Sequence, residues 1–356
     1  MKKMIFSILI ILLLGGCYDY VEIDDLAIIS GMVIDYKDNE FIINSQIIEN
    51  NSETQVRVFK TNGKTIEECL FKLSKVLNKD IFISHMKVLI LTESTINSNK
   101  DYYDYFLRDA KSKMNYYVYY VSDEYKDKIL DIYKDKTSSS LYIQDLMKVN
   151  NTIFSSSTPL SFMDFIYKKL NYGIDIIYPN LTIKKDNNED IIYLNNLVAF
   201  NKDNNKIVLN DKESIYYNML TNNLNKTIIN IPCEKDSFTL VVNNSKTNYK
   251  WNKTFNFDIS LSTKISSYSC KYDLNDKKSI DKLSKITNEY IKNNVNNIVN
   301  ISVNNKIDFI GIGNYIYKHD YKYFDFKKND WYDNLNKIKI NIKINTKITS
   351  IGEMRK

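Results

Sequence analysis

The sequence predicts a multi-domain α+β protein in which mixed or antiparallel sheets are each packed by helices. Apolar runs typical of strands alternate with amphipathic helical patterns along the chain. The connections between the first predicted strands are too short for crossover helices, which favours antiparallel pairs over a doubly wound nucleotide-binding fold. The chain also exceeds the roughly 250–300 residues at which a single core stops growing, so more than one domain is expected.

The first 17 residues have the pattern of a lipoprotein signal peptide. Two lysines precede an eleven-residue apolar run, residues 4–14, which is too short to cross a hydrocarbon core of ~30 Å. The run ends in a lipobox, Leu-Gly-Gly-Cys17, in which small residues fit a peptidase cleft and the cysteine thiol takes a diacylglyceryl group. We expect residues 1–16 to be cleaved and Cys17 to become the lipidated N-terminus, which makes Cys17 the one predicted site residue. The alternatives are a buried core helix and an ordinary signal peptide.

Composition limits the classes of partner. The hydrophobic content of 44% and the charged content of 26% are those of a folded globular protein. The formal net charge of +6 falls to +4 without the two lysines of the signal peptide. A charge this weak and dispersed does not indicate a nucleic-acid partner, although it is compatible with anionic lipid headgroups.

The cysteines beyond Cys17 are few and widely spaced. Cys69, Cys233 and Cys270 are an odd number and have no metal-ligand spacing. This pattern favours three separate buried thiols, with a Cys233–Cys270 bridge as the alternative.

The first part of the chain reads as strands and one clear helix. Strands are expected at residues 26–34, 41–48, 55–59, 88–91 and 116–121, with a hairpin turn at residues 37–39. Thr65 and Glu68 form the capping box of a helix, and a further helix is expected around residues 102–108. The apolar face of the first helix would contain Ile66, Cys69, Leu70, Leu73, Val76 and Leu77.

The middle of the chain is expected to be more helical. Helices are predicted at residues 138–149 and 160–170, the second opened by Thr158 and Pro159 and ended by Gly173. A turn at residues 178–180 would lead into a strand at residues 181–183. The wholly polar residues 184–190 mark the predicted domain boundary. We therefore expect an N-terminal α+β region at residues 17–190, in two subdomains, and a C-terminal α+β domain at residues 191–356.

The C-terminal part shows one long helix and one regular strand. Strands are expected at residues 194–200, 206–209, 238–242 and 255–265, followed by the longest helix near residues 279–299. The final strand, residues 337–348, alternates isoleucine with lysine at a period of two. Its basic face is interpreted as the solvated side of a half-buried strand.

No motif indicates catalysis, a cofactor or a metal. His85 and His319 are the two histidines; neither lies in a metal or nucleophile motif, and His85 is expected to be packed and hydrogen-bonded. Gly311-x-Gly313 lacks the third glycine of a phosphate-binding loop. Trp251 and Trp331 are interpreted as core residues rather than as the walls of a ligand pocket. The sequence therefore predicts a protein that is not an enzyme.

Several segments, in order along the chain, resemble one family. Cys17-Tyr-Asp leads into Glu22-Ile23-Asp24 and a first strand that ends near Asp35, as in the Ger(x)C family of spore germination receptor C-subunit lipoproteins. Further similar segments are His85-Met-Lys87-Val88, Phe106-Leu107-Arg108-Asp109, Leu197-Val198-Ala199-Phe200, and Ile307-Asp308-Phe309-Ile310-Gly311-x-Gly313 with Trp331. Tyr18 departs from the tryptophan that is usual in the family.

The resemblance implies a function that the residues alone do not. Members of this family act with integral-membrane A and B subunits in the spore inner membrane, where the receptor senses small nutrients and triggers germination. It implies a lipid-anchored, non-catalytic C subunit with about three mixed α/β domains and an extracytoplasmic location. The alternatives are a solute-binding lipoprotein that delivers a nutrient to a membrane transporter, and a secreted surface enzyme such as a cell-wall hydrolase.

Overall fold

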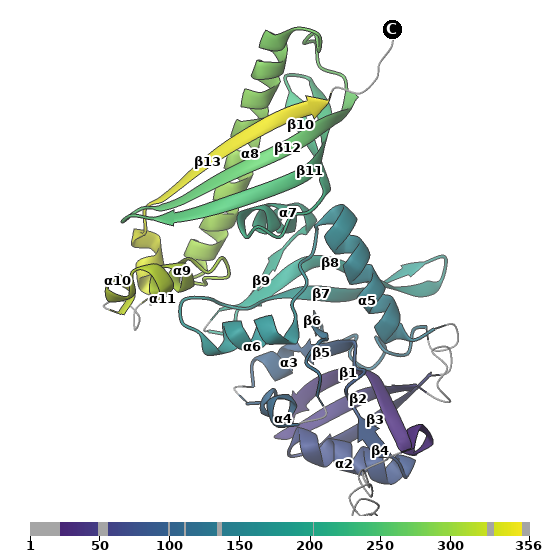
Figure 1. Ribbon diagram of the computed structural model, residues 1–356. Coiled ribbons are helices and arrows are strands. Elements are labelled where there is room, and N and C mark those ends of the chain that lie inside the picture. The colour runs from purple at the N-terminus through teal and green to yellow at the C-terminus, as the bar shows by residue number, and fades with distance from the viewer. Residues whose placement is uncertain are drawn as a thin grey trace, which may run out of the picture.

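The computed structural model describes residues 22–48, 56–98, 100–109, 112–133, 137–201, 203–325 and 331–350. Cys17 and the predicted signal peptide lie outside these residues. The described chain forms two sheets that are packed by helices (Figure 1). The predicted α+β class with mixed sheets is therefore confirmed.

The first sheet has nine strands in the order β3-β2-β1-β5-β6-β7-β8-β9, with β4 beside β1. The strands are β1 (Leu26–Lys37), β2 (Glu40–Ile48), β3 (Val56–Gly63), β4 (Asp80–Phe82), β5 (Val88–Thr92), β6 (Tyr117–Val121), β7 (Ile177–Asp186), β8 (Glu189–Phe200) and β9 (Lys206–Leu209). The ends of the sheet are antiparallel hairpins, and the centre pairs β1, β5, β6 and β7 in parallel. Parallel pairs require long connections, which here contain the helices.

Helices cover both faces of the first sheet. They are α2 (Ile66–Leu77), α3 (Glu93–Ile96), α4 (Asp104–Arg108), α5 (Ser139–Val149), with the π-helical turn η2 (Asn150–Phe154) after it, and α6 (Phe162–Leu170); the 3-10 turn η1 (Ile23–Asp25) precedes β1. Ile34 of β1 belongs to the core shared with α2, α4 and α6, whereas the adjacent Val33 belongs to the core shared with α5. The central strands are buried on both faces, which explains their continuous apolar sequence.

The second sheet has the order β10-β11-β12-β13. Its strands are β10 (Thr227–Cys233), β11 (Asp236–Trp251), β12 (Phe255–Tyr268) and β13 (Ile340–Ser350). The last two strands are parallel because α8 (Lys277–Asn304) connects them, and Figure 1 shows this long helix lying across the sheet. Shorter helices follow it: α9 (Ile312–His319), α10 (Tyr321–Asp325), α11 (Trp331–Asn334) and the 3-10 turn η4 (Leu335–Lys337).

One hydrophobic core joins the two sheets. Leu197 and Ala199 of β8 pack in the same cluster as Tyr216 and Tyr217 of α7 (Asp211–Leu220) and the inner face of the second sheet. Figure 1 shows α7 between the two sheets. The sequence predicts neither α7 nor β10. In α7 buried residues occur on every side, so the helix has no one-sided apolar pattern.

Local predictions in the N-terminal half are mostly confirmed. The turn at residues 37–39 joins β1 and β2, with Asp38 and Asn39 at positive φ. The Thr65 side chain accepts the Glu68 N–H as predicted, but the Glu68 carboxylate accepts the N–H of Lys64 rather than that of Thr65. Val76, placed on the apolar face of α2, is instead 68% exposed.

Three predictions around α6 and β7 are wrong. The helix begins at Phe162, because Ser161 and not Thr158 accepts a first-turn N–H, that of Asp164. Gly173 does not end the helix, which stops at Leu170. Residues 178–180 lie inside β7 rather than in a turn. The polar residues 184–190 form the hairpin between β7 and β8, because Asn187 and Asn188 supply the positive φ angles of a tight turn. The domain division near residue 190 itself stays a prediction.

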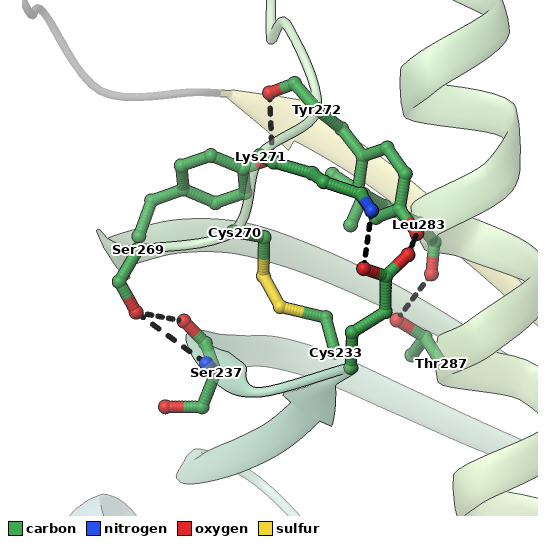
Figure 2. Close-up of a disulfide and its surroundings, with 10 residues drawn as sticks. Cys233, Ser237, Ser269, Cys270, Lys271, Tyr272, Leu283 and Thr287 are labelled. Atoms are coloured by element: carbon green, nitrogen blue, oxygen red, sulfur yellow. Dashed lines mark hydrogen bonds and ion pairs between the residues drawn. A yellow bond between two sulfur atoms is a disulfide. The ribbon is translucent and has the colours of Figure 1, made fainter.

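The favoured interpretation of three separate thiols is also wrong. Cys233, at the end of β10, is bonded to Cys270, which follows β12 (Figure 2). Among the described residues Cys69 is the free cysteine. Both half-cystines lie at one end of the sheet, because β10 and β12 flank β11 there. Ser269 donates to the Ser237 carbonyl at 2.8 Å beside the bridge.

We expect reduction of the Cys233–Cys270 bridge to lower the free energy of unfolding by about 4 kcal/mol, because the bridge closes a loop with a sequence separation of 37 residues. Urea denaturation with and without dithiothreitol measures this difference. The control variant Cys69→Ala should show the same sensitivity to reductant. Identical denaturation midpoints in both conditions would contradict the pairing.

Candidate functional site

A buried carboxylate, Asp308, occupies the loop that contains Gly311 and Gly313. Its Oδ1 accepts the N–H of Gly311 at 2.8 Å and of Ile312 at 2.9 Å, and its Oδ2 accepts the N–H of Gly313 at 2.7 Å. These N–H groups belong to the first turn of α9, a position that binds anions in many proteins. The Gly-x-Gly segment therefore does form an anion cradle, but the chain's own carboxylate fills it.

The cradle is closed by close packing against a tryptophan and another glycine. Trp331 donates its indole Nε1–H to Asp308 Oδ2 at 3.0 Å. A Cβ added to Gly313 would lie 2.5 Å from the Trp331 ring and 2.8 Å from the Cα of Gly173. Gly311 also has a φ of 84°, in the left-handed region that favours glycine. Neither glycine of the pair can be replaced without a shift of the surrounding backbone or ring.

Asp175 connects this loop to the first sheet. Its N–H donates to the Asp308 carbonyl at 2.9 Å, and its Oδ2 accepts the Asp308 N–H at 2.6 Å. The N–H of Asn314 donates to the Gly173 carbonyl at 2.7 Å. We call these residues, Gly173, Asp175, Asp308, Gly311, Gly313 and Trp331, the Asp308 junction. It joins the segment before β7 to the start of α9.

Burial raises the pKa of Asp308, the central carboxyl group of the junction. Desolvation raises the pKa of Asp308 to about 7, and the nearby charge of Asp175 acts in the same direction. The three backbone N–H groups oppose the rise because they stabilise the carboxylate. With four donors around one buried carboxyl group, the junction is suited to holding two parts of the fold together.

A second buried carboxylate lies at the end of β1. Asp35 accepts hydrogen bonds from Lys126 Nζ at 2.6 Å and Thr92 Oγ1 at 2.9 Å, and Ser94 donates to the same carboxylate. Burial alone would raise the pKa of Asp35, but Lys126, Ser94 and Thr92 together hold it below its usual value. Each acceptor and donor here is paired within the chain, so this cluster also has a structural role.

The exposed face of α6 presents an apolar surface. Met163, Tyr167 and Leu170 follow one another at helical spacing, and Met163 and Leu170 are 55% and 61% exposed. The surface continues to Tyr172 and Tyr321, since both rings contact Tyr317, at 6.2 and 5.5 Å between centroids. We call Met163, Tyr167, Leu170, Tyr172 and Tyr321 the α6 patch. Contiguous exposed apolar residues are typical of a protein interface.

The residues singled out in the sequence are not brought together. His85 is exposed beside Phe82, contrary to the packed position expected, and His319 stacks on Tyr315. Trp331 is buried as predicted, whereas Trp251 is partly buried and donates to Asp320. Within the described ranges, no group of three His, Cys, Asp or Glu side chains could hold a metal ion. No helix in the same ranges is long and apolar enough to cross a membrane.

Comparison with known families accounts for both halves of the chain. Residues 19–183 match the family model described as "Spore germination protein N-terminal domain", and residues 195–352 match "Spore germination B3/ GerAC like, C-terminal". The chain belongs to the Ger(x)C family. The family role is that of a germinant receptor C subunit in spore germination.

Two Ger(x)C relatives come from Bacillus subtilis (strain 168). Spore germination protein KC is 22% identical over 395 residues, which cover 98% of this chain and 95% of that protein. Spore germination protein A3 is 25% identical over 162 residues, which cover 42% of this chain and 43% of that protein. The solved "Crystal Structure of the GerBC protein" has a TM-score of 0.55 at 16% identity and covers 92% of this chain and 100% of that chain, a likeness of fold.

The segments that resemble the Ger(x)C family contribute the two buried carboxylates described above and their surroundings. Asp308, Gly311, Gly313 and Trp331 form most of the Asp308 junction, and Asp35 is the buried carboxylate of β1. Asp175 was not found from the sequence, because it is 133 residues from Asp308 and no local pattern marks it. An acidic residue three positions before a Gly-x-Gly is the one local signal that could have indicated the cradle.

We expect Asp308 to make stability depend on pH. Between about pH 4 and 7 the folded chain keeps a proton that the unfolded chain has lost, so the free energy of unfolding falls as pH rises through this window. The full shift corresponds to a loss on the order of 4 kcal/mol. Urea denaturation at pH 5, 6 and 7.5 should show this slope in the wild type and a weaker one in Asp308→Asn.

The matched control is Asp333→Asn, which removes an exposed carboxylate that pairs with Lys306. It should keep the wild-type slope. An Asp308→Asn variant with an unchanged slope would show that Asp308 does not titrate in this range.

Proposed function

We propose that this chain is the non-catalytic C subunit of a nutrient germinant receptor, anchored through a lipid on Cys17 to the extracytoplasmic face of the spore inner membrane. Membership of the Ger(x)C family over both halves of the chain is the observation that carries the proposal. Its partners would be the integral-membrane A and B subunits of the receptor.

The lipid anchor is supported by the N-terminal sequence. The lipobox places one cysteine, Cys17, directly after a short apolar run and a pair of glycines. A diacylglyceryl cysteine carries two acyl chains, and each buried CH₂ contributes about 0.8 kcal/mol, which suffices for stable anchoring. Residues 18–21 then separate the anchor from the first described residue, Glu22.

The extracytoplasmic location is supported by the Cys233–Cys270 bridge. Disulfides form and persist in oxidising compartments and are rare in the cytosol, where thiols are kept reduced. The single described free thiol, Cys69, is buried in the core of the first sheet, where its sulfur donates to the Phe41 carbonyl. A buried free thiol is compatible with both an oxidising compartment and the cytosol. The Cys233–Cys270 bridge is therefore the observation that bears on location.

The α6 patch is the surface we assign to a partner subunit. Met163 and Leu170 leave apolar side chains exposed on α6, and the tyrosines beside them provide large rings with polar ends. Aromatic and methionine side chains are enriched in the buried centres of protein interfaces. A non-catalytic subunit acts through such surfaces.

Replacement of Cys17 tests the anchor. In the spore-former of origin, Cys17→Ala should release the protein from the membrane fraction and slow germination by about tenfold or more, because a protein without acyl chains has no comparable membrane affinity. Cys69→Ala, which removes a cysteine outside the lipobox, should leave both unchanged. If Cys17→Ala spores retain the protein at the membrane and germinate normally, the anchor is not at Cys17.

Charges on the α6 patch test the partner surface. The double variant Met163→Lys, Leu170→Lys should reduce copurification with the A and B subunits by about tenfold or more, because it places two ammonium groups in an apolar contact. Both side chains are exposed, so the urea midpoint should not change. Val76→Lys, an equally exposed position on α2, is the control. Undiminished copurification of the double variant would exclude this surface.

A further inference from the structure

We propose that a pocket between α6 and the second sheet binds a small organic carboxylate with an apolar body. This goes beyond the proposed function, since a protein-binding subunit needs no ligand of its own. The pocket has a volume of about 210 Å³ and is walled by α6, the segment before β7, α7, β11, β12 and the Asp308 loop. Six aromatic side chains make up half of its lining residues: Tyr217, Tyr249, Phe255, Phe257, Phe309 and Tyr315.

The aromatic wall is fixed in place and apolar. Each tyrosine hydroxyl of the wall donates to a backbone carbonyl: Tyr217 to Phe309 at 3.4 Å, Tyr249 to Leu220 at 2.8 Å and Tyr315 to Tyr249 at 3.0 Å. Tyr249 packs edge-on against Phe257, with 5.6 Å between centroids, and Tyr315 packs edge-on against Phe255 at 5.3 Å. Since the hydroxyls are engaged elsewhere, the wall offers ring surface to a ligand.

Lys168 is the charged residue among those that line the pocket. No other described residue forms a hydrogen bond or ion pair with its ammonium group. Lys126, by contrast, is half-buried and pairs with Asp35 at 2.6 Å. Desolvation lowers the pKa of the Lys168 ammonium, and the charge of Asp164 opposes this only in part. A buried ammonium without a counter-charge is unfavourable unless something else pairs with it.

The hydroxyl group of Thr221, another polar side chain of the wall, is already paired. Thr221 Oγ1 donates to the Tyr217 carbonyl at 2.9 Å and accepts Asn223 Nδ2 at 3.0 Å. Lys168 is the charged group in the pocket lining that can orient an anionic ligand. An ammonium favours an anion, the rings favour an apolar body, and the volume limits the ligand to about the size of one aromatic ring with a carboxylate.

Titration calorimetry of the full chain in detergent, with benzoate as the probe, tests the site. We expect saturable benzoate binding, and at least about tenfold weaker binding of benzamide, which has the same shape without the charge. Lys168→Met keeps the apolar stem and should weaken benzoate binding by about tenfold or more. Lys169→Met, at the next position of α6 and outside the pocket wall, should bind benzoate as the wild type does.

Stability provides a second readout. Because Lys168→Met removes an unpaired buried charge, its urea midpoint without ligand should equal or exceed that of the wild type. The proposal is overturned if benzoate does not bind saturably below about 10 mM, or if Lys168→Met binds it unchanged. Equal affinity for benzoate and benzamide would overturn it as well, and that comparison needs no variant.

Discussion

Four N–H groups converge on one buried carboxylate, and the contact between the segment before β7 and the start of α9 depends on that arrangement. Asp308 accepts hydrogen bonds from the first turn of α9 and from the indole of Trp331. Asp175 and Gly173 connect the segment before β7 to the same loop through further hydrogen bonds. Loss of the carboxylate would leave several buried donors without an acceptor at once. The same loop forms one wall of the aromatic pocket, so the pocket's shape follows from the junction.

Much of the fold follows from local patterns in the sequence. Period-two alternation and one-sided helical faces predicted β1, β2, β12, β13, α2 and α8, because these elements bury one side or one continuous apolar run. The edge strand β10 was missed although alternate residues are buried, since Pro232 argues against a strand anywhere but at an edge. Helix α7 was missed because it is buried on several sides. A helix that is buried on several sides leaves no one-sided periodic pattern in the sequence.

The candidate sites also divide into one that a local sequence pattern predicts and others that only the fold brings together. Cys17 was predicted because a lipobox is read from neighbouring residues, although it lies outside the residues that the structure describes. The Asp308 junction, the disulfide and the Lys168 pocket each join residues that are far apart in the chain. For Asp175 and Asp308 the separation is 133 residues, and for the two half-cystines it is 37. Only the fold shows that the chain's own Asp308 fills the glycine loop and that no described residue forms a hydrogen bond or ion pair with the Lys168 ammonium.

The parallel pairing of β13 with β12 limits the order in which the two sheets can form during folding. Strand pairing in the first sheet needs no residue after Leu209, so that sheet can assemble while the rest of the chain is still being delivered. In the second sheet β10, β11 and β12 can pair as consecutive hairpins. Strand β13 joins β12, with Phe255 and Ile340 as the first partner pair, only after α8 and the shorter helices that follow it. Such long-range closure is slow compared with hairpin formation. Until it occurs, the β12 edge that pairs with β13 has no partner strand, and an unpaired strand edge is a template for aggregation.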